Sequence, residues 1–208
     1  SWSILASYPD SVDVNSQRDT RLLELTPHMG STMATKIRVY SAVSLDGFLA
    51  GENDELDWLG DSDAEIQGDP GTIDFPSLLN QTGSMLMGRR TFDIVRSFAG
   101  PWPYGELPVL VATHRSIEEC PPNIRPVSGN ITALCKQAVT EAGDLDVYLD
   151  GGELISQALD ADLVDEMVLT IVPVLLGRGI PLYKGAGRPR FSIDRSGTFG
   201  KMIQVVMT

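Results

Sequence analysis

The sequence predicts an α/β domain: a mixed, mostly parallel sheet with helices on both faces and an antiparallel hairpin at the C-terminal end. Three observations lead to this prediction. Short apolar runs alternate with segments of helical spacing from Lys36 onward, consecutive strand-like runs close the chain, and 208 residues are too few for two full domains and a linker. Residues 1–32 are polar and weakly periodic, so we expect a peripheral N-terminal extension there and the domain over residues 33–208.

The predicted strands are runs of apolar and β-branched residues. The first, KIRVYSAVSL at residues 36–45, is almost continuously apolar, which is typical of a strand buried on both faces. In the run over residues 164–176, Pro173 is expected to mark a bulge or a kink. The last segment favours a hairpin that turns around Ser196–Gly200. The other strands are expected at residues 84–88, 107–113, 123–128 and 145–152.

Three segments have helical spacing. Residues 90–98 repeat apolar side chains at the intervals of one helix face, and residues 153–161 do the same after a glycine pair. Between them, NITALCKQAVTEAG predicts an amphipathic helix with Asn130 as its N-cap and Gly143 as its C-terminal stop.

Charge and composition exclude several classes of protein. The chain has 16 basic and 28 acidic residues, a net charge of -12, which argues against a nucleic acid or an anionic membrane as partner. No apolar run approaches the length of a membrane span, and the first residues lack the regions of a signal peptide, so we expect a cytoplasmic protein. Cys120 and Cys135 predict neither a disulfide scaffold nor a metal site.

Two predicted strand-to-helix junctions carry glycine in the same place, at Met87–Thr91 and at Leu149–Glu153. A helix N-terminus offers unpaired N–H groups and partial positive charge, and a glycine ahead of it lets an anion approach closely. Two such junctions on neighbouring strands would bracket a pyrophosphate. The alternative is that each glycine merely lets the chain enter its helix.

A basic segment follows the strand predicted at residues 107–113. Thr113, His114, Arg115 and Ser116 combine hydroxyl, imidazole and guanidinium groups, which suits a phosphate monoester. The alternative is a solvated loop that happens to be basic.

The loop after the first strand offers two further candidates. Asp46, beside a glycine in SLDGF, either caps a turn or faces a ligand. Trp58 either covers a planar ligand or anchors the loop to the core. No Ser/His/Asp arrangement is readable, because the chain has two histidines and neither has the context of a triad.

Taken in order, the motifs SLDGF, LMGRRTF, VATHRS, YLDGGELI and LVDEMVLTIVPVLLGRGIPLY resemble the dihydrofolate reductase superfamily. The resemblance is greater to the branch that includes the C-terminal reductase domain of bacterial riboflavin biosynthesis enzymes. It runs from about Lys36 to the end of the chain and implies a dihydrofolate-reductase-like fold with NADPH bound across the C-terminal edge of the sheet.

The resemblance also assigns the cofactor positions. It implies a backbone contact to the nicotinamide carboxamide, a phosphate-binding helix start, a strand end beside the adenosine 2′-phosphate, and a glycine turn under the pyrophosphate. Residues 51–58 would correspond to a mobile loop over the nicotinamide. In that order, the residues are Ala42; Gly88, Arg89, Arg90 and Thr91; Thr113, His114, Arg115 and Ser116; and Leu149, Asp150, Gly151, Gly152, Glu153, Leu154 and Ile155.

The function that the resemblance implies is hydride transfer from NADPH to a small heterocyclic or carbonyl substrate. The acid of true dihydrofolate reductases has no counterpart at the expected spacing, so Asp74 and Asp46 are the candidate proton donors, with a bound water as the alternative. Trp58 and Arg178 are expected on the substrate side. A homodimer is also expected. The alternative function is a nucleotide-binding or sensor protein of the same fold without turnover.

Overall fold

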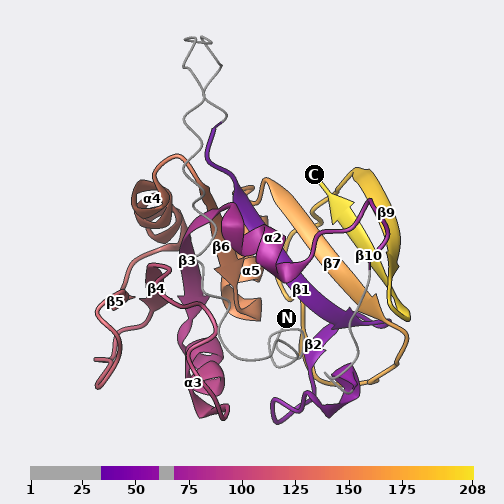
Figure 1. Ribbon diagram of the computed structural model, residues 1–208, viewed down its shortest axis with the longest axis horizontal. Helices are drawn as coiled ribbons and strands as arrows, with labels where there is room; N and C mark the ends of the chain where they lie inside the picture. The colour runs from indigo at the N-terminus through magenta and orange to yellow at the C-terminus, as the bar shows by residue number, and fades with distance from the viewer. Residues whose placement is uncertain (1–33, 61–67) are drawn as a thin grey trace, which may run out of the picture.

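The computed structural model describes residues 34–60 and 68–208 (Figure 1). Its main sheet has eight strands in the order β5-β4-β3-β6-β1-β7-β10-β9, and a small second sheet pairs β2 with β8. The strands are β1 (Ile37–Ser44), β2 (Phe48–Ala50), β3 (Thr82–Gly88), β4 (Val109–Ala112), β5 (Ile124–Val127), β6 (Asp146–Asp150), β7 (Glu166–Val172), β8 (Ile180–Pro181), β9 (Ile193–Phe199) and β10 (Met202–Met207). The helices are η1 (Asp57–Leu59, a 3-10 turn), α2 (Phe75–Asn80), α3 (Arg89–Ser97), α4 (Ile131–Ala142) and α5 (Gly152–Asp160).

The topology confirms the predicted mixed sheet. Six neighbouring strands, from β5 to β7, run parallel, whereas β10 lies antiparallel to both β7 and β9. The expected N-terminal extension, residues 1–32, lies outside the described residues. In the two described ranges, no helix is long and apolar enough to cross a membrane.

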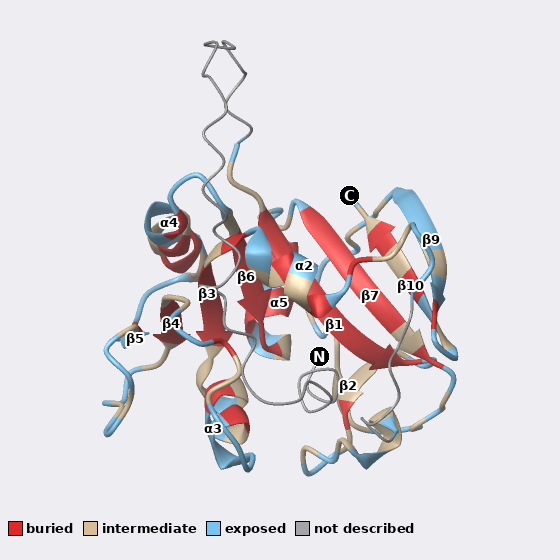
Figure 2. Ribbon diagram, viewed as in Figure 1, coloured by how far each residue is buried: buried red, intermediate tan, exposed pale blue. Residues whose placement is uncertain are grey.

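Helices cover both faces of the sheet, as predicted. On one face α4 and α5 pack through Leu134, Ala138, Ile155 and Ala158 against the core that includes Leu149. On the other face α2 and α3 pack against a second core. This second core contains Phe75, Leu78, Phe92 and Val95 from the helices, with Tyr40 and Tyr148 from the sheet. Figure 2 shows the central strands buried, whereas the edge strand β9 is largely exposed.

The strand predicted over residues 164–176 is shorter than expected. It ends as β7 at Val172, because Pro173 has no N–H to continue the ladder. The amide of Val174 instead donates to the Val172 carbonyl at 2.8 Å, and Leu175 is 69% exposed. The elements that the pattern did not predict are the short ones: β2, η1, α2 and β8.

A buried ion-pair network joins four segments at the N-terminal ends of the parallel strands. The Arg38 guanidinium, on β1, donates to Glu166 at the start of β7 (2.7 Å) and to Asp146 at the start of β6 (3.3 Å). It also donates to Gln81, just before β3, at 2.8 Å. Arg38 is 3% exposed and Glu166 7%, so the network fixes the strands at the edge opposite their C-terminal ends.

The sheet divides between β1 and β6 toward its C-terminal edge. These strands pair over three residues only, from Ile37↔Val147 to Val39↔Leu149, although β1 stays paired with β7 as far as Ser44. Beyond Val39 the β6 side of β1 therefore has no strand partner in the sheet. In open α/β sheets a division of this kind is where ligands bind.

Candidate active site

The two glycine junctions meet at the C-terminal edge, because β3 and β6 are parallel neighbours with Met87 opposite Asp150. A Cβ built on Gly151 would lie 2.9 Å from the Thr91 hydroxyl oxygen and 3.3 Å from the Gly88 nitrogen. Gly151 also has a φ of 109°, a conformation that L side chains rarely adopt. Glycine is therefore required here, and it lets the starts of α3 and α5 lie side by side.

The helices that begin at these junctions differ from the other two in how they start. The N-cap of α2 is Asp74, whose side chain accepts from the Ser77 amide, and that of α4 is Asn130, as predicted, accepting from Ala133. The N-caps of α3 and α5 are Gly88 and Gly151, and within residues 34–60 and 68–208 neither helix has a side-chain cap. Both therefore present uncapped N–H groups at one edge of the sheet, which is the arrangement that binds phosphate.

The basic strand end lies beside the start of α3, since Ala112 on β4 is opposite Gly88 on β3. Arg89 donates to Asp93 at 2.8 Å and to the Ser116 carbonyl at 3.1 Å. Arg115 approaches the same Asp93 at 3.9 Å and is 73% exposed in its side chain. The structure thus brings together Arg89, Arg115 and the 113–116 loop, in which His114 is exposed and Thr113 partly buried.

Arg90 is engaged by the loop that follows β2. Its Nε and Nη2 atoms both donate to Asp54 Oδ2, at 3.0 and 2.9 Å. Asp54 has a φ of 66°, and its second carboxylate oxygen is buried with no partner in the described part of the chain. A loop carboxylate therefore contacts the arginine that was predicted to hold a phosphate.

Ala42 lies on the divided stretch of β1. Lys36 accepts from Val147 on the β6 side, and Ile37 accepts from Asp165 on the β7 side, so successive residues alternate between the two neighbours. By this alternation Ala42 directs its backbone groups toward the β6 side, where no strand pairs with them. This is the orientation that the predicted contact to a carboxamide needs.

Asp150 differs from the other residues of its glycine turn. Its carboxyl group is buried, accepts from the Gly151 amide at 2.7 Å and from the Tyr148 hydroxyl at 3.3 Å, and belongs to the end of β6 at the division. Burial raises the pKa of Asp150 from 3.8 to about 6. Burial thus favours its protonated form to a higher pH than in an exposed aspartate, and the sequence interpretation had not considered it as an acid. The signal was present: an aspartate closing an apolar strand ahead of a Gly-Gly pair.

Asp46 and Asp74, the two predicted acids, have structural contacts instead. Asp46 accepts from the Ser44 hydroxyl (2.6 Å) and from the amides of Leu176 and Gly177, so hydrogen bonding lowers its pKa. Asp74 is exposed and caps α2. Neither arrangement favours a proton donor: Asp46 is held in its ionised form and Asp74 is committed to a helix N-terminus.

The remaining predicted positions are spread around the edge. The Trp58 indole, which is half-buried, donates to the Glu55 carbonyl within its own loop, and the exposed Arg178 pairs with Glu52 at 3.7 Å. Glu153 contacts Lys184, which lowers its pKa. Gly152 packs under β8, and the side chains of Leu149, Leu154 and Ile155 are in the core, where they support the turn. Among the described residues no group of His, Cys, Asp and Glu has the arrangement of a metal site.

Sequence reasoning missed an aromatic group around Asp150. Tyr104, on the loop between α3 and β4, packs edge-on against Tyr148 (ring centroids 6.4 Å apart), Phe75 (6.2 Å) and Trp102 (5.2 Å). No spacing rule identifies these residues, because the loop that carries Trp102 and Tyr104 has neither strand nor helix periodicity.

Comparison with known proteins identifies the family of the chain. The family model of the RibD C-terminal domain matches residues 35–205. The uncharacterized protein YwjB of Bacillus subtilis is 29% identical over 175 residues, 83% of this chain and 97% of that protein. The solved structure of a "Putative riboflavin biosynthesis protein" from Shewanella sp. PV-4 is 31% identical with a TM-score of 0.69, covering 83% and 98% of the two chains.

A more distant solved structure shares the fold alone. It is the diaminohydroxyphosphoribosylaminopyrimidine deaminase/5-amino-6-(5-phosphoribosylamino)uracil reductase of Thermotoga maritima, 15% identical with a TM-score of 0.58. The match covers 84% of this chain and 56% of that one. With the family model spanning most of its length, this chain belongs to the RibD C-terminal domain family and has its dihydrofolate-reductase-like fold.

Proposed function

We propose that this chain is an NADPH-dependent reductase that transfers hydride to a small heterocyclic or carbonyl substrate. The observation that carries the proposal is the pair of uncapped helix N-termini, α3 and α5, held in contact at Gly88 and Gly151. Two adjacent anion sites of this kind suit the two phosphates of a dinucleotide. Membership of a family of reductase domains supports the same reaction class.

The residues present fit NADPH. Gly151 lets the uncapped starts of α3 and α5 lie in contact, and Arg89 and Arg115 stand at the adjacent strand end, where a 2′-phosphate would favour NADPH over NADH. Ala42 would meet the carboxamide through its backbone. When bound, the cofactor supplies the hydride, and the protein supplies position and exclusion of water.

Asp150 is our candidate for the proton that accompanies hydride transfer. It lies at the end of β6, and its raised pKa, about 6, matches a group that donates a proton near neutral pH. The Tyr148 hydroxyl shares its one proton between the Tyr40 carbonyl (3.0 Å) and Asp150 (3.3 Å), which ties the carboxyl group to the end of the pairing between β1 and β6. Asp150 would act as general acid and be reprotonated from solvent between turnovers.

The basic side chains of the segment around Arg178 are paired with acidic ones. Arg178, which is expected on the substrate side, lies 3.7 Å from Glu52, and Lys184 contacts Glu153.

Calorimetric titration with NADPH and NADH tests the cofactor. We expect NADPH to bind with a Kd well below 1 mM and more tightly than NADH, and binding of neither would refute the proposal. Consumption of NADPH with a panel of pterins, pyrimidines and carbonyl compounds then tests turnover. Tight binding without turnover on any of them would instead favour the nucleotide-binding or sensor alternative.

A further inference from the structure

The loop between α3 and β4 carries two buried hydrogen-bond donors without acceptors. Tyr104 is 4% exposed, and its hydroxyl group has no partner within the two described ranges. The indole N–H of Trp102 is likewise buried and unpartnered there. A buried donor without an acceptor is costly, and phenylalanine at either position would avoid the cost. The presence of these two unpaired donors therefore indicates a function for them.

Both rings are held firmly. Trp102 packs edge-on against Phe92 (ring centroids 5.7 Å apart) and against Tyr104 (5.2 Å). The Trp102 carbonyl accepts from the Gly105 amide, and the Tyr104 carbonyl accepts from Leu107 at 3.0 Å. The Asn123 side chain also donates to the carbonyls of Gly105 and Leu107. A loop fixed in this way keeps its donors pointing in one direction, as a preorganised binding site requires.

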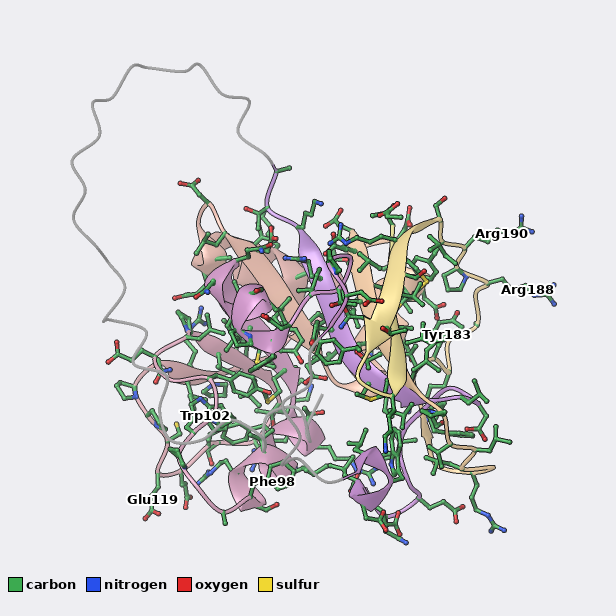
Figure 3. The ribbon with its side chains drawn as sticks, turned by 45° about the vertical axis from the view of Figure 1, so that its right-hand side comes forward. Phe98, Trp102, Glu119, Tyr183, Arg188 and Arg190 are labelled. Atoms are coloured by element: carbon green, nitrogen blue, oxygen red, sulfur yellow. The ribbon has the colours of Figure 1, made fainter. Side chains whose placement is uncertain are left out.

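Tyr104 lies near the acid of the proposed reaction, and Trp102 packs beside Tyr104 through their ring contact. Tyr104 contacts Tyr148, whose hydroxyl donates to Asp150. Burial, with the nearby Asp150 charge, raises the pKa of Tyr104 well above its usual value, so its hydroxyl remains a donor at all physiological pH values. Figure 3 shows Trp102 near α3, on the opposite side of the view from Tyr183, Arg188 and Arg190, which belong to a separate surface.

We propose that Trp102 and Tyr104 are specificity-determining residues that donate hydrogen bonds to acceptor atoms of the substrate, at the aromatic wall beside Asp150. This inference rests on the proposed function. The ligand it requires is planar, to pack against the rings, and carries carbonyl or ring-nitrogen acceptors in its plane. Because both donors are shielded from water in this structure, binding requires a local shift of the side chains that cover them.

Calorimetry with two probe ligands tests the proposal in the presence of saturating NADP⁺. Lumazine is a planar bicycle with carbonyl acceptors, whereas indole is a planar bicycle with a donor and no in-plane acceptor. We expect the wild-type chain to bind lumazine and not indole. Tyr104→Phe keeps the ring, and Trp102→Phe replaces the indole with a smaller ring. Each should weaken lumazine binding about tenfold, the effect of one lost hydrogen bond, without changing the Kd of NADP⁺.

Thermal unfolding gives a second readout that separates a functional from a structural hydroxyl. Tyr104→Phe removes an unpaired buried group, so its midpoint should rise by about 2–4 °C. The control Tyr183→Phe removes a hydroxyl that donates to Asp160. It should not raise the midpoint and should leave lumazine binding unchanged.

The outcomes are distinguishable from failure of the proposed function. Failure of the wild type to bind lumazine, lumazine affinities within twofold of wild type in both variants, or a lower midpoint for Tyr104→Phe would each overturn the inference. Absence of NADPH and NADP⁺ binding would instead overturn the proposed function. The lumazine titration is therefore repeated without nucleotide, so that lumazine binding is measured independently of NADP⁺ binding.

Discussion

Replacing Asp150 by asparagine should stabilise the fold at neutral pH and abolish most of its activity. Burial raises the pKa of Asp150 from 3.8 to about 6, an interval that corresponds to about 3 kcal/mol at about 1.36 kcal/mol per pH unit. Between these two pH values the folded chain keeps the proton that the unfolded chain has released. Stability is therefore lost as the pH rises through this window, and the full cost is present above about pH 6.

The asparagine side chain cannot ionise, so the variant escapes this cost. We expect Asp150→Asn to be more stable than wild type by about 3 kcal/mol at pH 8, equivalent to roughly 6–12 °C in Tm, and by about half as much at pH 5. Near pH 4 the difference should be below about 1 kcal/mol. Thermal unfolding monitored by circular dichroism at pH 4, 5 and 8 measures it.

The control is Asp144→Asn, which removes one exposed carboxylate close by in the sequence and should show no such trend. A stability difference between wild type and Asp150→Asn that stayed constant from pH 4 to pH 8 would refute the reasoning, because a constant difference reports lost contacts and not ionisation. Unchanged turnover in Asp150→Asn would remove it as the proton donor.

Four other substitutions test the edge and the scaffold. Asp54→Asn should release Arg90 from its ion pair and tighten NADPH binding by up to about fivefold, the energetic scale of an exposed ion pair, as measured by fluorescence titration. Weaker binding would contradict the idea that Asp54 competes with phosphate for Arg90. Arg115→Ala should weaken NADPH and spare NADH, so equal losses would remove it from the 2′-phosphate. Gly151→Ala should abolish NADPH binding, because the added Cβ would meet the start of α3 and because the φ of 109° at this position disfavours a side chain. Tight NADPH binding by this variant would show that the two glycine junctions need not be in contact. Arg38→Met removes the guanidinium from the buried Glu166, which keeps only Lys36 at 3.8 Å, and should cost about 3 kcal/mol in urea unfolding. A loss below about 1 kcal/mol would mean that the network does not hold the strands together.

The predictable parts of the fold are those in which periodicity and end signals agree. The helix at Ile131–Ala142 starts after Asn130 and ends at Gly143, as its capping residues indicated. The strand before it and the apolar strand β1 were equally clear. By contrast β2 and β8 have two or three residues each, too few to show a period, and the end of β7 at Val172 depends on one missing N–H.

In the site, the glycine junctions were identifiable because their chemistry is local. A helix start and a glycine are adjacent in sequence, and the parallel sheet brings the two junctions together. The sequence marks the position of Asp150 but not its raised pKa, because that pKa comes from burial in the folded chain, against which the hydrogen bond from Tyr148 acts. Asp54 and Arg90 are 36 positions apart in the sequence, and the local pattern around neither residue predicts their ion pair.

The short pairing of β1 with β6 affects how the two parts of the sheet would respond to nucleotide binding. Three register pairs join these strands, the fewest between any two neighbours in the eight-stranded sheet. The sheet is therefore divided beyond Val39, whereas the Arg38 network joins the same strands at the other end. A dinucleotide lying across the divided end would bridge the two parts, so amide hydrogen exchange in residues 40–44 should slow on nucleotide binding more than exchange in the outer strands.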